Sequence, residues 1–201
     1  MATKNEEHLI TREQLLRAAI RAFAREGFRG ASVRNIANSA GVNFPLVTYH
    51  FGSKEKLWLA VAKRTLTEII EMGEAFTADE NASPDSNFAA YLDHVLTDST
   101  EHRDRRIILG QISARRDNPV VDSLVPLIEE FLTKSTARIQ RLLDNGFESE
   151  LPASDIQMIL RGLLASNASA PQGPAALFGF ESNEALVNHQ VSLLMRLFKN
   201  A

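Results

Sequence analysis

Apolar residues recur every three or four positions along most of this chain, and no stretch alternates between apolar and polar residues as a half-buried strand would. The first predicted helix begins at Thr11, which forms a capping box with Gln14, and it ends at Gly27. Residues 1–10 precede it as a polar arm with little to bury. The pattern therefore predicts an all-α fold.

Two short helices joined by a tight turn are predicted between Ala31 and Lys56. Ser32 is a suitable N-cap for the first of them, and Gly41 ends it in the left-handed conformation that glycine adopts without steric cost. Asn43 caps the second helix, whose first turn accommodates Pro45. This arrangement is a helix-turn-helix, in which the second helix can enter the major groove of DNA. Its buried stripe is predicted to be Val47 and Phe51.

From Thr11 to about Lys63, the chain resembles the N-terminal domain of the TetR family of transcriptional regulators. The matching residues are 15–19, 23, 27–28, 32–37, 40–42, 49–51, 53–54 and 57. The resemblance implies three parts: a polar arm (1–10), a three-helix helix-turn-helix DNA-binding domain (11–56), and a helical effector-binding and dimerisation domain (57–201). The chain departs from the family at Thr48, where a second aromatic residue often precedes Tyr49 and His50.

Base recognition needs side chains at the start and on the outer face of the second helix. That face holds Phe44, Leu46 and Thr48, and Asn43 and Pro45 lie at its N-terminal end. The two apolar side chains would suit thymine methyl groups, unless one of them packs against the preceding helix. The resemblance also implies phosphate contacts from six residues. These are Tyr49, His50 and Lys54, together with Ser32, Val33 and Arg34. For His50, a packing role is the alternative.

Charge is distributed unevenly along the chain. Residues 1–64 hold 11 Lys and Arg against 5 Asp and Glu, a formal charge of +6, whereas residues 65–201 hold 11 against 20, a charge of −9. A basic N-terminal segment that contains a helix-turn-helix favours binding to DNA. Arg17, Arg21 and Arg25 recur every fourth residue there, and a solvated helix face is a simpler interpretation of them than phosphate contact.

After Ser53 the pattern predicts only helices. A helix capped by Ser53 runs into the 70s, and a loop around Asp79–Asp85 follows it. Further helices cover residues 88–96 and 107–112, and a longer helix closes at Gly146 with a kink or a delayed start at Pro126. The last two predicted helices, separated by an irregular loop, are Pro152–Ala170 and Ser182–Phe198.

The resemblance implies a pocket for a small-molecule effector among the helices between residues 63 and 147. Aromatic side chains at helical spacing are more often core residues than ligand contacts, so each candidate has a packing alternative. The arginines at 103, 105, 106, 115 and 116 offer charge for an anionic ligand, or are solvated helix ends. The candidate pocket residues are Phe76, Phe88, Tyr91, His94, Gln111 and Phe131.

The last two predicted helices carry matching apolar stripes, with small residues that permit close approach of another helix. Such a pair can form a four-helix bundle with its copy, and a two-fold dimer suits a palindromic operator. The alternative is a helix pair packed only on its own chain. The predicted dimer-interface residues are Ile159, Leu163, Leu164, Ser166, Leu186, Val187, Val191 and Leu194.

Several classes of function are disfavoured by what the sequence lacks. The chain has no cysteine, no paired-histidine motif with metal-ligand spacing, no serine-hydrolase elbow and no Walker A sequence. We therefore expect no enzyme, no metal, no cofactor and no membrane span. The resemblance implies instead a cytoplasmic homodimer that acts as a ligand-released repressor on double-stranded DNA. The alternatives are an architectural or cell-division factor that binds DNA without an effector, and an all-helical interaction module.

Overall fold

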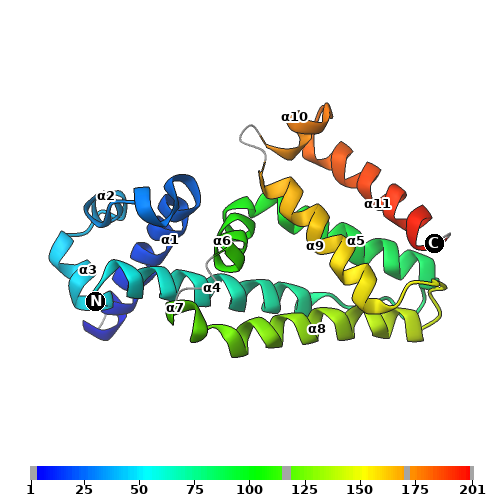
Figure 1. The fold of residues 1–201 in the computed structure, drawn as a ribbon, viewed down its shortest axis with the longest axis horizontal. Helices are drawn as coiled ribbons and strands as arrows, with labels where there is room; N and C mark the ends of the chain where they lie inside the picture. The colour runs from blue at the N-terminus through cyan, green and yellow to red at the C-terminus, as the bar shows by residue number, and fades with distance from the viewer. Residues whose placement is uncertain (1–3, 115–118, 170–172, 200–201) are drawn as a thin grey trace. The chain divides into compact units, whose positions relative to one another are not determined.

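The computed structural model describes residues 4–114, 119–169 and 173–199, and every regular element in these ranges is a helix (Figure 1). The chain divides into two compact units. Unit 1 comprises residues 1–67 and 108–127, and unit 2 comprises residues 68–107 and 128–201. The helices are α1 (Lys4–Gly30), α2 (Val33–Ser39), α3 (Phe44–Phe51), α4 (Lys54–Ala75), α5 (Pro84–Glu101), α6 (Arg103–Ala114), α7 (Pro119–Asp122), α8 (Val125–Asp144), α9 (Ala153–Ser169), α10 (Pro174–Phe178) and α11 (Asn183–Lys199).

Unit 1 packs α1, α2 and α3 around the first half of α4. Its largest fully buried side chains include Phe23 on α1, Ile36 on α2 and Trp58 on α4. The Phe28 ring stacks on Phe23 with centroids 6.2 Å apart and meets the edge of Trp58 at 6.3 Å. These contacts fix the helix-turn-helix on a rigid base, as a DNA reader requires.

The predicted start of the first helix at Thr11 is wrong, because α1 already begins at Lys4. The residues before Thr11 include Lys4, Glu6 and Glu7, which are good helix formers, so the helix continues upstream of the apparent cap. The predicted end at Gly27 is confirmed as a break, since this glycine has a φ of 70° and interrupts the helical backbone.

The turn between α2 and α3 follows the predicted local signals. The Ser32 hydroxyl accepts a hydrogen bond from the Asn35 N–H at 3.4 Å, and Gly41 has a φ of 69°. Asn43 occupies the N-cap position of α3 without a side-chain cap bond, and Pro45 lies in the first turn. Ser53 caps α4 through the Lys56 N–H at 3.2 Å.

Replacing Gly41 with alanine is expected to lower the free energy of unfolding by about 1–2 kcal/mol, because an L side chain is strained at positive φ. A Cβ at this position would have no neighbour within 4 Å, so the loss would report backbone strain alone. Urea denaturation measures it. Gly110→Ala is the matched control, since Gly110 is helical, exposed and equally uncrowded. Equal stability of Gly41→Ala and the wild-type protein would contradict the strain argument.

Unit 2 has an aromatic centre formed by α5, the segment after α8, and α11. The Phe88 and Phe147 rings stack with centroids 3.9 Å apart, and the Phe198 ring meets Phe88 edge-on at 6.0 Å. Asn167 on α9 and Gln190 on α11 are buried and exchange two side-chain hydrogen bonds of 3.1 and 3.0 Å. This pairing satisfies both amides and fixes the register of the last two long helices.

Three further features differ from, or refine, the expected organisation. The loop expected between the last two helices contains a short helix, α10, with Pro174 at its start and Gly179 ending it at a φ of 76°. The delayed start at Pro126 is confirmed, since this proline is the second residue of α8. The expected domain boundary at residues 56/57 falls inside unit 1, because α4 is continuous and its first half packs with α1.

Candidate nucleic-acid interface and internal cavity

Helix α3 has one buried face and one exposed face. Val47 and Phe51 are 2% and 7% exposed and hold the helix on unit 1, as its apolar spacing predicts. Phe44, Leu46 and Tyr49 are exposed, and Tyr49 is the most open at 72%. Three large apolar or aromatic side chains on one short exposed surface indicate a surface that meets a partner.

The flanks of α3 are basic. The Arg34 guanidinium lies over the Phe44 ring, 5.8 Å from its centroid, and so links the start of α2 with the start of α3. Lys54 lies over the Phe28 ring at 5.0 Å and donates to the Arg29 carbonyl at 3.2 Å. An ammonium group has three donors, so Lys54 is held in place and can still bind a phosphate.

The other predicted DNA contacts lie on the same part of unit 1. Asn43, Pro45 and Thr48 are exposed on α3 or at its N-terminal end. His50 is half-buried, and its ring lies 5.4 Å from the Tyr49 ring. Ser32, Val33 and Arg34 lie at the start of α2, where Ser32 forms the cap and Val33 is half-buried. The structure thus brings the predicted contacts together around two neighbouring helices.

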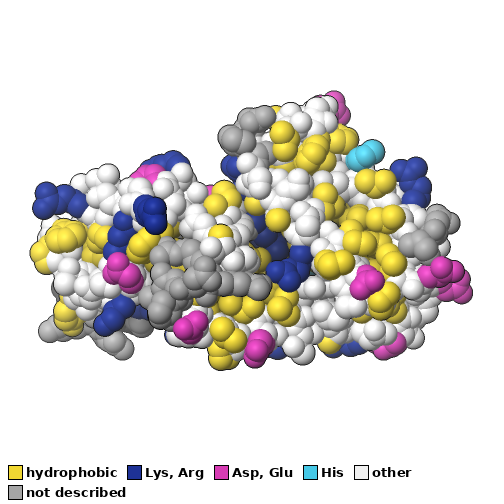
Figure 2. Space-filling model, in the orientation of Figure 1, with side chains coloured by type: hydrophobic (Ala, Val, Ile, Leu, Met, Phe, Trp, Pro, Cys, Tyr) yellow, Lys and Arg dark blue, Asp and Glu magenta, His cyan; other side chains and the backbone are white. Residues whose placement is uncertain are grey.

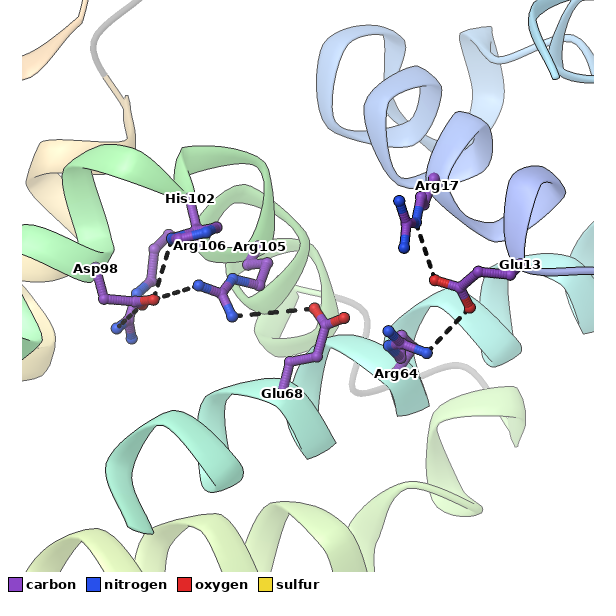
Figure 3. A network of polar contacts seen from close by, with 8 residues as sticks. All are labelled: Glu13, Arg17, Arg64, Glu68, Asp98, His102, Arg105 and Arg106. Carbon is purple, nitrogen blue, oxygen red and sulfur yellow. Dashed lines mark hydrogen bonds and ion pairs between the residues drawn. The ribbon is translucent and has the colours of Figure 1, made fainter. Parts of the chain in front are cut away.

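Two of the three arginines in the series on α1, Arg17 and Arg25, form ion pairs with glutamates. Glu13 accepts from Arg17 at 3.0 Å and from Arg64 at 3.1 Å, and Figure 3 shows this carboxylate between the two guanidinium groups. Arg25 pairs with Glu26 at 2.5 Å. The solvated-face interpretation therefore agrees with the geometry of Arg17 and Arg25.

Unit 2 contains a cavity of about 40 Å³ between α4, α5, α6, α8 and α9. Only two of the six predicted pocket residues, Tyr91 and Phe131, line it. Phe76 instead lines an outer groove of about 650 Å³, and Phe88 is part of the aromatic centre. The remaining two, His94 and Gln111, do not line the cavity, because each forms a hydrogen bond elsewhere. His94 hydrogen-bonds the Met72 carbonyl, and Gln111 belongs to unit 1, where it donates to the Phe23 carbonyl.

The polar lining of the cavity was missed by sequence reasoning. It consists of side chains on α6, α8 and α9: Arg106, Ser135, Arg138, Gln157 and Arg161. A helical wheel contains a signal for two of them, since Phe131, Ser135, Arg138 and Leu142 recur at positions i, i+4, i+7 and i+11. A serine and an arginine within an otherwise apolar stripe indicate polar groups that face the interior.

A buried carboxylate organises the junction between α5 and α6. Asp98 accepts from Arg105 and, at 3.1 Å, from Arg106, and the His102 Nδ1 atom lies 3.2 Å from it (Figure 3). Glu68 adds a longer contact to Arg105 at 4.0 Å. Burial lowers the pKa of the Arg106 guanidinium, and the Asp98 carboxylate acts in the opposite direction. A charged helix junction is thus present here, with Asp98 at its centre.

The other arginines that were candidates for an anionic ligand have different positions. Arg103 donates to the Ala168 carbonyl at 3.1 Å, near the C-terminal end of α9. Such a contact satisfies one of the carbonyl groups that a helix end leaves without an intrahelical partner. Arg115 and Arg116 lie outside the described residues.

The predicted dimer residues divide into buried and accessible groups. Leu164, Leu186, Val187 and Leu194 are at most 7% exposed and belong to the core of unit 2, so these four were wrong as surface residues. Ile159, Leu163 and Val191 are half-buried, and Ser166 is exposed. Hydrophobic side chains gather over α9 and α11 on the face seen in Figure 2. The exposed apolar residues that sequence reasoning missed are Met158, Leu193 and Leu197.

Comparison with known proteins identifies the helix-turn-helix. Residues 15–61 match the profile described as "Bacterial regulatory proteins, tetR family". Residues 15–61 are therefore a DNA-binding domain of the tetR type. The predicted resemblance of the chain and its all-helical fold class are thus confirmed. In the part of the chain that the structure describes, no helix is both long and apolar enough to cross a membrane.

Individual TetR-family relatives match over different lengths. The chain is 43% identical over 51 residues to the HTH-type transcriptional repressor NicS of Pseudomonas putida, a match that spans 25% of this chain and 24% of NicS. It is 29% identical over 160 residues to the HTH-type transcriptional regulator BetI of Stenotrophomonas maltophilia, which covers 78% and 76% of the two chains. A tetR-family regulatory protein from Rhodococcus RHA1 has the same fold over 100% of both chains, with a TM-score of 0.75 at 15% identity.

Proposed function

We propose that this chain is a transcriptional regulator of the TetR family that binds a palindromic DNA operator as a homodimer and is released by a small-molecule effector. The observation that carries the proposal is the exposed surface of α3, where Phe44, Leu46 and Tyr49 project from a helix anchored by Val47 and Phe51. Apolar groups on a recognition helix suit thymine methyl groups, and the basic residues beside them suit phosphates.

Support for a dimer comes from the outer face of α9. Gly162 is exposed, and a Cβ there would meet no atom within 4 Å, so its own chain does not require a glycine at this position. Ala165 and Ser166 continue the small-residue stripe, and Met158 lies one turn before it at 66% exposure. Small residues let a second helix approach closely, and the exposed apolar side chains would be buried by it.

Release by an effector requires that the ligand and the operator favour different conformers. Helix α4 is continuous through the boundary between the units, which falls between Thr67 and Glu68. Its residues 69, 72 and 73 line the cavity in unit 2, whereas its residues 57 and 58 are in the core of unit 1. A ligand that displaces α4 at the cavity therefore has a covalent route to the DNA-binding unit.

Tyr49→Ala is expected to weaken binding to the selected operator about tenfold, because the variant loses an exposed aromatic group that reaches DNA. Selection from random and genomic duplexes with the purified wild-type protein supplies the operator, and fluorescence anisotropy across a salt series measures the affinity. Loss of one phosphate contact per subunit should also reduce the slope of log affinity against log salt by about two per dimer.

Phe178→Ala is the matched control, since Phe178 is an exposed aromatic residue of unit 2 at 46% exposure. It should bind the operator like the wild-type protein. Enrichment of no palindrome, with weak binding to all duplexes alike, would contradict sequence-specific regulation and favour an architectural role. Equal affinity of the Tyr49→Ala variant and the wild-type protein for the operator would contradict the placement of α3 at the DNA interface.

A further inference from the structure

The residues that line the cavity in unit 2 carry positive charge and include no carboxylate. Arg106 and Arg138, which are 6% and 9% exposed, both line it. Arg106 shares Asp98 with Arg105, which also has the longer contact to Glu68 at 4.0 Å. The buried Arg106 Nε atom has no hydrogen-bond partner among the described residues. Arginine remains charged inside a protein, so this charge persists although burial opposes it.

Arg138 carries the less balanced of these two charges. None of the described carboxylates forms an ion pair with it, and its polar neighbour is the Tyr91 hydroxyl. Burial raises the pKa of Tyr91, so this phenol stays neutral and does not balance the charge. Glu74 is the acid that acts on Arg138 from a distance, but its carboxylate is held by Lys134 at 2.6 Å. Hydrogen bonding with Lys134 lowers the pKa of Glu74, and Lys134 also binds Glu130 at 2.8 Å.

Neutral hydrogen-bonding groups surround these two arginines. Gln157 lines the cavity and donates to the Ser135 hydroxyl at 3.0 Å. The remaining wall includes apolar Val95 and Leu160, and exposed Arg161 adds a third guanidinium group on α9. Two buried cations, a hydroxyl and an amide within apolar walls favour an anionic group and exclude a cationic one.

The volume limits what the cavity holds. About 40 Å³ corresponds to roughly three water-sized groups, which is the size of a carboxylate. The body of a larger ligand needs another space, and Arg138 also lines the outer groove of about 650 Å³. Apolar Phe76 and Leu142 line this groove together with charged residues that include Glu74, Lys134 and Arg141. Arg138 therefore lies where the acid group of a ligand in the cavity would join its apolar body in the groove.

We propose that the effector is an organic acid whose carboxylate binds Arg138 and Arg106 in the cavity and whose apolar body occupies the groove beside Phe76. This inference rests on the proposed function, since it names the chemical class of the effector. Its carboxylate would displace the Arg138 guanidinium, which packs against α4 at Gly73, because this side chain lines both the cavity and the groove. An acid would thus discriminate between the two conformers, as release from DNA requires.

Gly73 offers a test that leaves the charge in place. A Cβ at this position would lie 2.5 Å from the Arg138 Nη1 atom and 3.0 Å from its Cζ atom, so the guanidinium packs directly on the backbone of α4. Gly73→Ala would displace the end of this side chain, while alanine itself favours the helix. The Gly73→Ala variant therefore changes the position of the Arg138 guanidinium without changing its charge.

The experiment measures binding of straight-chain carboxylates from butanoate to decanoate, with the primary amide of each as a neutral isostere, by calorimetry and thermal shift. We expect one or more acids to bind at least about tenfold more tightly than the matching amide. Arg138→Gln and Gly73→Ala should each lose about tenfold in affinity for that acid. Arg141→Gln is the matched control, because Arg141 is on the same helix, is exposed, and lines only the groove. It should keep the affinity within about threefold.

Three results would overturn the inference. These are the absence of any acid binding up to about 1 mM, equal binding of acid and amide, and unchanged acid affinity in Gly73→Ala and Arg138→Gln. If Arg138→Gln fails to fold, the Gly73→Ala variant decides. Operator binding is measured in parallel on the same preparations. A palindrome bound without any acid response rejects the acid effector alone, whereas acid binding without operator selection rejects the proposed function alone.

Discussion

Replacing Asp98 with asparagine is expected to lower the free energy of unfolding by about 3–5 kcal/mol. The carboxylate is 8% exposed and accepts from Arg105 and Arg106, which are themselves 13% and 4% exposed at their side chains. Asparagine keeps the shape of the side chain but leaves buried Arg106 without a carboxylate and half-buried Arg105 with the longer contact to Glu68 at 4.0 Å. The cost is mainly that of the unbalanced charges rather than of the lost attraction.

Urea denaturation followed by circular dichroism measures this loss. Asp93→Asn is the matched control, since Asp93 is an exposed carboxylate on the same helix, and it should change stability by no more than about 0.5 kcal/mol. A loss below about 1 kcal/mol in Asp98→Asn would mean that water or a shifted carboxylate compensates the arginines. That outcome would also weaken the charge argument for the cavity.

The helix-turn-helix was predictable because its signals are local. A serine cap, a glycine at positive φ and a proline in a first turn each act within four residues, and Ser32, Gly41 and Pro45 take these positions in the structure. The alternation of buried Val47 with exposed Leu46 and Thr48 is likewise set by the helical period. The start of α1 was missed because a capping motif is compatible with a helix interior when the preceding residues favour a helix.

The cavity was not predictable in the same way, because burial of a polar side chain depends on what packs over it. Aromatic residues were expected in the pocket, yet Phe88 is fully buried against Phe147 and Phe198, which are distant in the sequence. Arg138 was overlooked because an arginine is usually exposed. Only the packing of α4 at Gly73 against its guanidinium makes it an interior residue.

The predicted dimer interface on α9 and α11 was also only partly predictable from the sequence. The apolar spacing of α9 and α11 predicts that both helices bury a face, but it does not distinguish a face buried on its own chain from one buried on a copy. Leu164 and Leu194 are in the core of unit 2, and Met158 and Leu193 point outward. The residues left exposed after the chain has formed its own core are the better candidates for an interface.

Leu193→Asp is expected to convert the proposed dimer to a monomer and to lower the affinity for a full palindrome by about 100-fold or more. Leu193 is 48% exposed on α11, so a charge there is solvated in the monomer but would be buried without a partner in a helix-to-helix interface. Loss of the second, intramolecular binding event removes the gain from two linked DNA-binding units. Sedimentation equilibrium gives the mass, and fluorescence anisotropy gives the affinities for the palindrome and for one half-site.

Val125→Asp is the matched control, because Val125 is 44% exposed on α8 and lies in unit 1, away from α9 and α11 in the chain. An acidic residue is also well tolerated at the start of a helix. This variant should remain dimeric. In Leu193→Asp, affinity for a half-site should be unchanged while affinity for the palindrome falls to the same value, since α3 and its exposed side chains are not altered. A dimeric Leu193→Asp variant would place the interface elsewhere, and a monomer that retains full palindrome affinity would show that the operator is read by independent subunits.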